Sequence, residues 1–224
     1  MAVAVADIIN RAQIILQDTT GTRWPNTELL NWLNDSYKEI VQARPDLYPV
    51  TAPSFPCVAG TRQAAPTGAL RMIDVVRNGS GAKRAVRLID RRILDDQLPS
   101  WHSEAGSAEI QHWMFDPRTP REFLVYPPAS SGATLEIIYS AVPAPHASAT
   151  GNIAIIDSYG NVMLDYILYR AYTKDAEYTA NAARAQAHYQ AMMNAMTSGA
   201  NSDAAGRPGA QPGLQPTPGQ TTVR

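Results

Sequence analysis

The hydrophobic period of this chain changes twice, and that change limits the possible folds more than any other feature. Apolar residues recur at helical spacing over residues 4–18 and 27–43, and again over residues 157–197. Between Tyr48 and Pro145, short β-branched or aromatic runs alternate with prolines and turn residues. A period of 3.6 residues indicates helices, whereas short bounded runs indicate strands. The sequence therefore predicts an α+β fold.

The order of these segments predicts an antiparallel α-helical bundle, of two N-terminal and two C-terminal helices, with an inserted small antiparallel β domain. We expect four parts: an N-terminal helical pair (1–46), an antiparallel β region with long loops (47–152), C-terminal helices completing the bundle (153–197) and an extended partner-binding tail (198–224). The expected strands are 70–76, 84–89, 110–115, 122–126 and 134–139, with a short helix within 88–97.

The first C-terminal helix is apolar on almost every side over residues 162–172. A helix without a polar face is buried on several sides. In the following segment, seven of the sixteen positions from 180 to 195 are alanine, which favours helix and permits close helix approach. We therefore expect inter-helix packing by aromatic and methionine side chains, namely Tyr166, Tyr169, Tyr172, Met192 and Met193.

The last 27 residues, 198–224, contain five glycines and four prolines. Such a segment buries too little apolar surface to offset its ordering entropy of about 1–2 kcal/mol per residue. We expect it to be extended and to gain structure against a partner. The alternative is that it rests on its own domain.

Composition excludes several classes of protein. The chain is 45% hydrophobic, which suffices for a core, and its net charge of -1 gives no general attraction to nucleic acid or anionic membranes. One cysteine, Cys57, permits no internal disulfide. No apolar run reaches the roughly 18 residues of a membrane span, and the N-terminal segment reads as a helix rather than a secretion signal.

Candidate catalytic and metal-binding residues are weak. His102, Glu104, Glu109 and His112 are close in sequence but lack metal-ligand spacing, which favours solvated loop residues. Cys57 follows Pro56 in an apolar context and is expected to be a buried or strand-edge thiol. We predict no catalytic, cofactor or metal site, and a protein that is not an enzyme.

Positive charge concentrates in one stretch, from residue 71 to residue 92. It has seven cations and two acids, a net charge of +5 that the remaining chain balances with -6. The cations are Arg71, Arg77, Lys83, Arg84, Arg87, Arg91 and Arg92. They could form a subunit interface, a solvated strand surface or a DNA-facing lumen.

Several local patterns occur together in a familiar order. They are WP (24–25), LLNWLND (29–35), ARPD (43–46), IDRRILD (89–95), PSW (99–101), FDPR (115–118), FLVYPP (123–128) and YRAYTKDAE (169–177). In this order they resemble the head-to-tail adaptor, or connector, proteins of short-tailed phages, which are related to tail tubular proteins. The resemblance covers residues 5–195.

The resemblance implies a structural virion protein at the head–tail junction, assembled in the host cytoplasm. Such adaptors form a ring, commonly of twelve copies, that docks on the portal protein and carries the tail nozzle or tail fibres. Double-stranded DNA passes through the lumen without sequence-specific binding, and no membrane is involved. C-terminal extensions of adaptors grip the portal, so the expected portal-binding residues are Arg207, Leu214, Val223 and Arg224.

Two other functions stay open from the residues alone. A tail-associated cell-wall hydrolase would use Glu104 or Glu109 as its acid. A non-specific DNA-binding module would use the stretch from Arg71 to Arg92.

Overall fold

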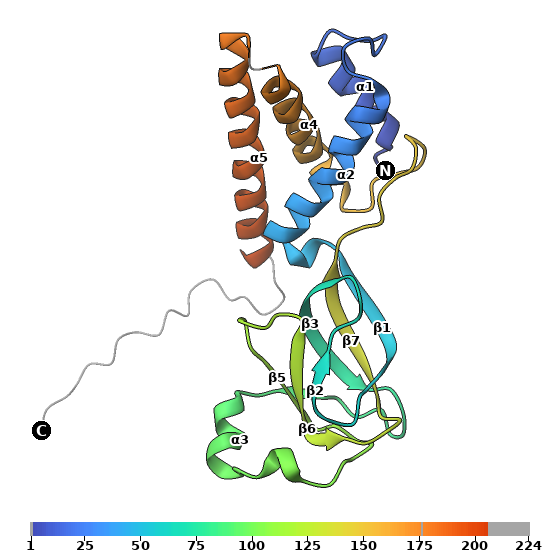
Figure 1. The fold of residues 1–224 in the computed structure, drawn as a ribbon, viewed down its shortest axis with the longest axis vertical. Coiled ribbons are helices and arrows are strands. Elements are labelled where there is room, and N and C mark those ends of the chain that lie inside the picture. Colours follow the sequence, from blue (N-terminus) through green and yellow to red (C-terminus); the bar gives the residue numbers. More distant parts are fainter. Residues whose placement is uncertain (1, 176, 206–224) are drawn as a thin grey trace, which may run out of the picture.

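The computed structural model describes residues 2–175 and 177–205, and side chains up to residue 201. The molecule is elongated, with a helical part at one end and a β part at the other (Figure 1). The helical part contains α1 (Val5–Ile15), α2 (Asn26–Ala43), α4 (Gly160–Lys174) and α5 (Thr179–Ala205). The predicted α+β class is confirmed.

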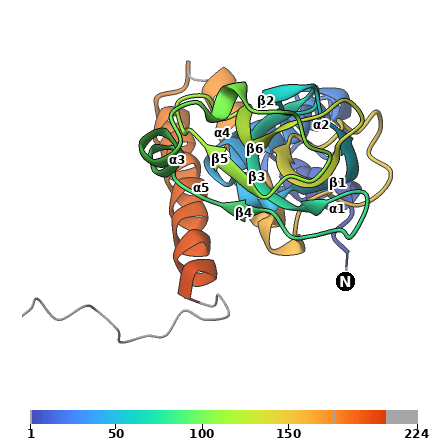
Figure 2. The ribbon, with the colours of Figure 1, turned by 90° about the horizontal axis from the view of Figure 1, so that it is seen from below.

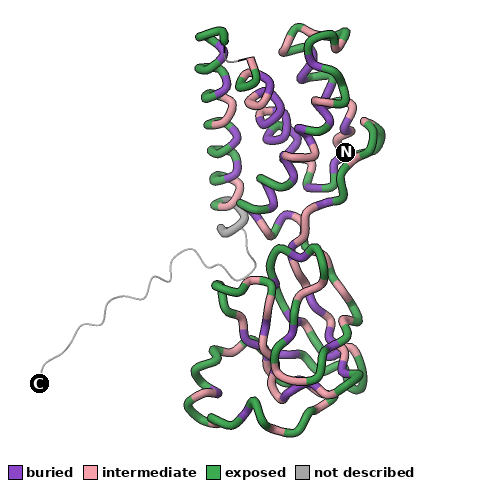
Figure 3. Tube along the Cα trace, viewed as in Figure 1, coloured by how far each residue is buried: buried purple, intermediate pink, exposed green. Residues whose placement is uncertain are grey.

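Helix α4 lies at the centre of the helical part. It packs against α1, α2 and α5, and Met163 and Ile167 on it are fully buried. These side chains share one core with Ile8 of α1 and Leu33 of α2. The prediction that the apolar segment 162–172 is buried on several sides is confirmed, and Figure 3 shows α4 as a mostly buried helix.

Seven strands form two sheets in the β part. The first sheet has the order β1-β7-β3, and the second has the order β2-β6-β5-β4. The strands are β1 (Pro49–Pro56), β2 (Gly60–Ala64), β3 (Ala69–Asn78), β4 (Arg87–Leu88), β5 (His112–Phe115), β6 (Glu122–Ala129) and β7 (Thr134–Ala141). Helix α3 (Arg91–Gln97) lies between β4 and β5, close to the expected short helix.

Both sheets contribute side chains to a second hydrophobic core. Val75 of β3 and Ile137 of β7 come from the first sheet, and Trp113 and Phe123 come from β5 and β6 of the second. Alternation explains their burial, because successive side chains of a strand point to opposite faces. Leu135 and Ile137 are fully buried, whereas Glu136 between them is partly exposed.

Two details of the predicted β region are wrong. Strands β1 and β2 were not among the expected strands, and β1 contains Pro49, Pro53 and Pro56. Strand β1 tolerates them because it is an edge strand that pairs only with β7 and has a register shift between Ala52 and Phe55. The sheet is also not wholly antiparallel: β4 runs parallel to β5, since the connection through α3 crosses over.

Helix α5 extends to Ala205, eight residues beyond the predicted boundary at residue 197. The rest of the predicted tail, residues 206–224, lies outside the described residues. The additional helical turns approach a buried polar cluster at the end of α2. There the Nη1 atom of Arg44 donates a hydrogen bond to the Tyr159 hydroxyl at 3.0 Å, and Asp46 accepts two hydrogen bonds from the same guanidinium.

Gly199 permits this approach. A Cβ atom at this position would lie 2.8 Å from the Tyr159 hydroxyl and 3.4 Å from the Arg44 Nη1 atom. Alanine is otherwise favoured over glycine inside a helix by about 1 kcal/mol. The close contact therefore explains a glycine within a long helix, and it fixes the last turns of α5 against Arg44 and Tyr159.

This contact predicts energetic coupling between Gly199 and Tyr159. Gly199→Ala should fail to stabilise the wild-type chain, because the added methyl group collides with the hydroxyl. In the Tyr159→Phe background the same change should stabilise the chain by about 1 kcal/mol, because the helix gains an alanine and the hydroxyl that opposed it is gone. Urea unfolding of the four variants measures the coupling. Additive effects of the two substitutions would contradict the proposed contact.

Candidate assembly surfaces

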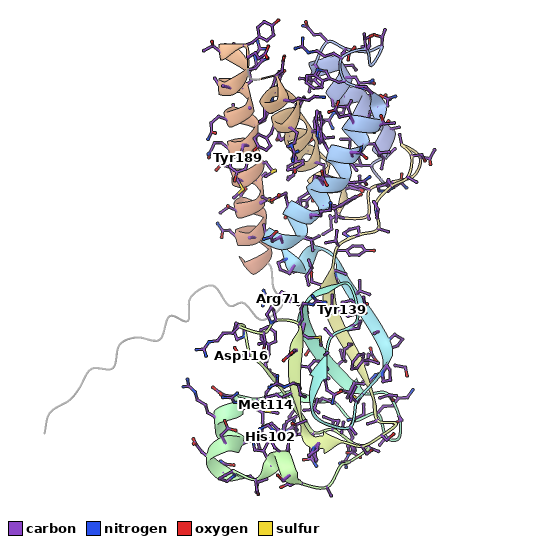
Figure 4. All side chains as sticks on the ribbon, viewed as in Figure 1. Arg71, His102, Met114, Asp116, Tyr139 and Tyr189 are labelled. Carbon is purple, nitrogen blue, oxygen red and sulfur yellow. The ribbon has the colours of Figure 1, made fainter. Side chains whose placement is uncertain are left out.

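The seven cations of the stretch 71–92 do not form one continuous surface. They lie on β3, on the following loop, on β4 and on α3. Arg71 lies at the end of the β part nearest the helices, whereas His102 marks the region of α3 at the other end (Figure 4). The residues are therefore spread along the β part, and whether they face a subunit or a lumen stays a prediction.

Three of these cations pair with acids of the same chain. Ion pairs join Arg77 to Glu136 at 2.5 Å, Arg84 to Glu109 at 3.0 Å and Arg91 to Asp95 at 3.1 Å. The Arg71 guanidinium lies over the Phe115 ring, 5.7 Å from its centroid. Among the described residues, Arg71, Lys83, Arg87 and Arg92 have no carboxylate partner, so the local charge excess is smaller than the sequence suggests.

Most of the predicted packing residues of the C-terminal helices lie between α4 and α5. Tyr166 is buried, and Tyr169 contacts Tyr189 of α5 with ring centroids 5.2 Å apart. Tyr172 stacks on His188, whose Nδ1 atom lies 2.9 Å from a carboxylate oxygen of Asp165. These contacts hold α5 along α4.

Met193 does not pack into the core of its own chain, so its predicted role in helix packing stays a prediction about contacts with a partner. Met192 is 2% exposed, but Met193 is 37% exposed and lies on the outer side of α5. Adjacent helical residues point about 100° apart, so they cannot both face α4. Met193 is therefore available to a partner rather than to the core.

The two methionines allow a matched stability test. Met192→Ala should lower the free energy of unfolding by about 2–3 kcal/mol, because it leaves a cavity in the helical core. Met193→Ala should change it by less than about 0.5 kcal/mol. Denaturant unfolding of the monomer measures both. Equal losses would show that Met193 supports the folded subunit.

Other large apolar side chains are exposed at the outer end of the helical part. Ile14 is 64% exposed and Ile15 is 44% exposed, both at the end of α1, and Tyr178 before α5 is 61% exposed. Helices α1 and α5 lie on opposite sides of the helical part in two perpendicular views (Figures 1 and 2). At this outer end, however, Ile15 lines one hollow together with Asn181 and Arg184 of α5, so the exposed side chains there are not all on opposite sides.

The described residues show no group of three or more metal-ligating side chains. His102 stacks on Trp101 and contacts the Thr61 hydroxyl at 2.9 Å. Burial raises the pKa of Tyr126, and the neighbouring Glu104 carboxylate adds to this effect. Glu109 pairs with Arg84. Each candidate from the sequence therefore has an ordinary structural contact.

Cys57 is buried, as expected, and burial raises the pKa of its thiol to about 11. Thiolate is the reactive form of cysteine, so this side chain is protonated at neutral pH and unsuited to nucleophilic chemistry. None of the helices in the described part of the chain has the length and apolarity that crossing a membrane requires.

The predicted portal-binding residues Arg207, Leu214, Val223 and Arg224 lie outside the described residues.

The sequence analysis missed Asn78, a buried side chain that joins two loops of the β part. Its sequence context, Asn-Gly-Ser-Gly, indicates only a turn. No signal in the sequence distinguishes a buried asparagine from a turn asparagine there.

A helical part of four helices joined to a two-sheet β part, with large apolar side chains exposed on the helices, suits a structural component of an assembly. The family model described as SU10 adaptor protein matches residues 3–212. The chain belongs to the SU10 adaptor protein family and is a phage structural adaptor of the virion. A search of curated proteins finds no match.

Proposed function

We propose that this adaptor forms a ring, of twelve copies, between the portal protein and the tail nozzle of a phage particle. The observation that supports a ring most directly is the placement of α1 and α5 on opposite sides of the helical part. A closed ring needs two different, mutually complementary patches on each subunit. The exposed Ile14 on α1 and the outer face of α5 around Met193 are proposed as such a pair.

The composition of α5 supports this role. Arg184 is the only Lys, Arg, Asp or Glu over residues 179–201. A helix face exposed to water usually carries charges, whereas the outer face of α5 carries Ala183, Ala187, Gln190 and Met193. Small and uncharged side chains permit a neighbouring helix to approach closely. In this proposal the four helices form an antiparallel bundle that builds the ring wall.

The tail is proposed to bind the portal. Its sequence is rich in glycine and proline, and it carries two cations and two larger aliphatic residues as candidate anchors: Arg207, Leu214, Val223 and Arg224. Helix α5 continues to Ala205 and lies close to Tyr159 at Gly199, which supports a partner-binding part that begins at residue 206 rather than 198. The remaining proposed parts are the helical pair 1–46, the inserted β domain 47–152 and the helices from 153 onward.

The β part is proposed to face neighbouring copies, the nozzle or tail fibres, with DNA passing through the lumen unbound to any sequence. Low net charge supports free passage, because each neutralised phosphate would add affinity. The intramolecular pairing of Arg77, Arg84 and Arg91 supports this further. Assembly would take place in the host cytoplasm. No observation favours the hydrolase or the DNA-binding alternative.

Mass measurement of the protein, alone and with portal rings, tests the assembly and the role of the tail together. We expect the full chain to bind portal as one ring of about twelve copies. A truncated chain ending at Ala205 should keep its folded circular dichroism spectrum but fail to co-sediment with portal. Co-sedimentation of the truncated chain would refute the role of residues 206–224.

A charge placed on either apolar edge tests the ring interface. Met193→Glu and Ile14→Glu should each weaken ring formation by at least about tenfold, because an unpaired charge would be buried between subunits. Ser131→Glu, in the exposed turn between β6 and β7, adds the same charge elsewhere and serves as the control. Rings of unchanged stability in both variants would place the subunit contact on other surfaces.

A further inference from the structure

A hollow of about 430 Å³ opens on the surface of the β part. One wall is formed by residues 84, 85 and 87, which lead into and begin β4, and the other by residues 109–112, which lead into β5. The basic stretch 71–92 thus contributes one wall. The other wall contains Glu109 and His112, which the sequence analysis considered as metal ligands. The phage adaptor role assigns no function to this hollow.

Asn78 connects the two walls through hydrogen bonds, and its side chain is buried, with 2% exposed. Its side-chain amide donates hydrogen bonds to the carbonyl oxygens of Arg84 at 3.0 Å and Ile110 at 2.8 Å, and its side-chain oxygen accepts one from the Ile110 amide at 2.8 Å. The Arg87 amide also donates to the Gln111 carbonyl at 3.0 Å. A buried and fully bonded asparagine fixes the spacing of the walls, so the hollow is preformed.

Positive charge exceeds negative charge in this hollow. Arg84 and Arg87 contribute two cations, and Glu109, already paired with Arg84 at 3.0 Å, contributes the one carboxylate of the lining. The Arg87 side chain is exposed and has no carboxylate partner among the described residues. Its guanidinium therefore has its full set of donors available to a ligand.

His112 forms part of the opposite wall. Its ring stacks on Tyr126 with centroids 6.2 Å apart and planes at 13°, which holds its orientation. The Nδ1 atom is shielded from solvent and has no hydrogen-bond partner within the described part of the chain. An atom without contact to solvent is also out of reach of a ligand that enters from solvent, so His112 shapes the wall and Arg87 is the group that a ligand can contact. Because Arg87 and His112 are register partners of β4 and β5, the two groups lie across from each other.

We propose that this hollow binds the carboxylate of an acidic segment from a partner protein, with Arg87 as its main ligand. A planar guanidinium matches a carboxylate through two parallel hydrogen bonds. DNA phosphate is the less favoured ligand, because backbone binding uses a track of several cations. Here Arg84 is paired with Glu109, which leaves Arg87 as the one unpaired cation in the lining of the hollow.

Titration of the full chain with a fluorescent glutamate-rich peptide tests this site, at roughly 0.15 M salt to screen distant charges. We expect saturable binding that Arg87→Ala weakens by about tenfold, the loss of one charge-assisted bidentate contact. Arg118→Ala removes the same charge from the exposed turn before β6, outside the hollow, and should change affinity by less than about twofold. Arg87→Lys keeps the charge but loses the planar geometry, so it should also weaken binding.

Equal effects of Arg87→Ala and Arg118→Ala, or the absence of saturable binding, would overturn the proposal. Full affinity in Arg87→Lys would show that charge alone attracts the peptide and would overturn the bidentate contact. Tighter binding of a short DNA duplex through Arg87 would reassign the hollow to phosphate. Circular dichroism confirms that the variants are folded. Arg87 belongs neither to the apolar side chains proposed for the ring contact nor to the tail, so this proposal and the proposed function can fail separately.

Discussion

The burial of α4 on three sides is the constraint on which the helical part depends. This helix contacts α1, α2 and α5, and it contributes Met163 and Ile167 to the shared core. Removing apolar surface from water is the main favourable term in folding, and α4 has almost no polar side to leave in water. The other three helices therefore have to surround it, and their outer faces become the faces that the subunit offers to its surroundings.

Covering α4 leaves an unusual surface on α5. One side of α5 packs through Met192 and Tyr189 onto α4, while the other has small and uncharged residues. Helix α1 likewise has one side in the core, and its last residues Ile14 and Ile15 are exposed. A monomer gains nothing from such edges, but an assembled adaptor does. The family relationship and the surface chemistry thus agree, although they are independent observations.

The sequence predicted the helices well and the β part less well, for physical reasons. Helical periodicity is a local property, so α1, α2 and α4 lie close to their expected ranges. Strand β1 was hidden by its prolines, which only its edge position makes acceptable. The parallel pairing of β4 and β5 depends on the path of the chain through α3, and periodicity carries no information about that path. Met192 and Met193 are adjacent and equally apolar, so the sequence alone does not reveal that Met192 faces the core and Met193 does not. The walls of the hollow meet only in three dimensions, through Asn78.

The β part begins and ends at one place, since Pro49 of β1 pairs with Ser140 of β7. Its whole core lies between these two positions, apart from the core that surrounds α4. Two genetic crossovers, at the codons of Pro49 and Ser140, lie about 90 codons apart in the gene, but the two residues are neighbours in the protein. Such crossovers would exchange the whole β part and leave the helical part intact. The β part is thus a unit that can change while the helices that surround α4 stay the same.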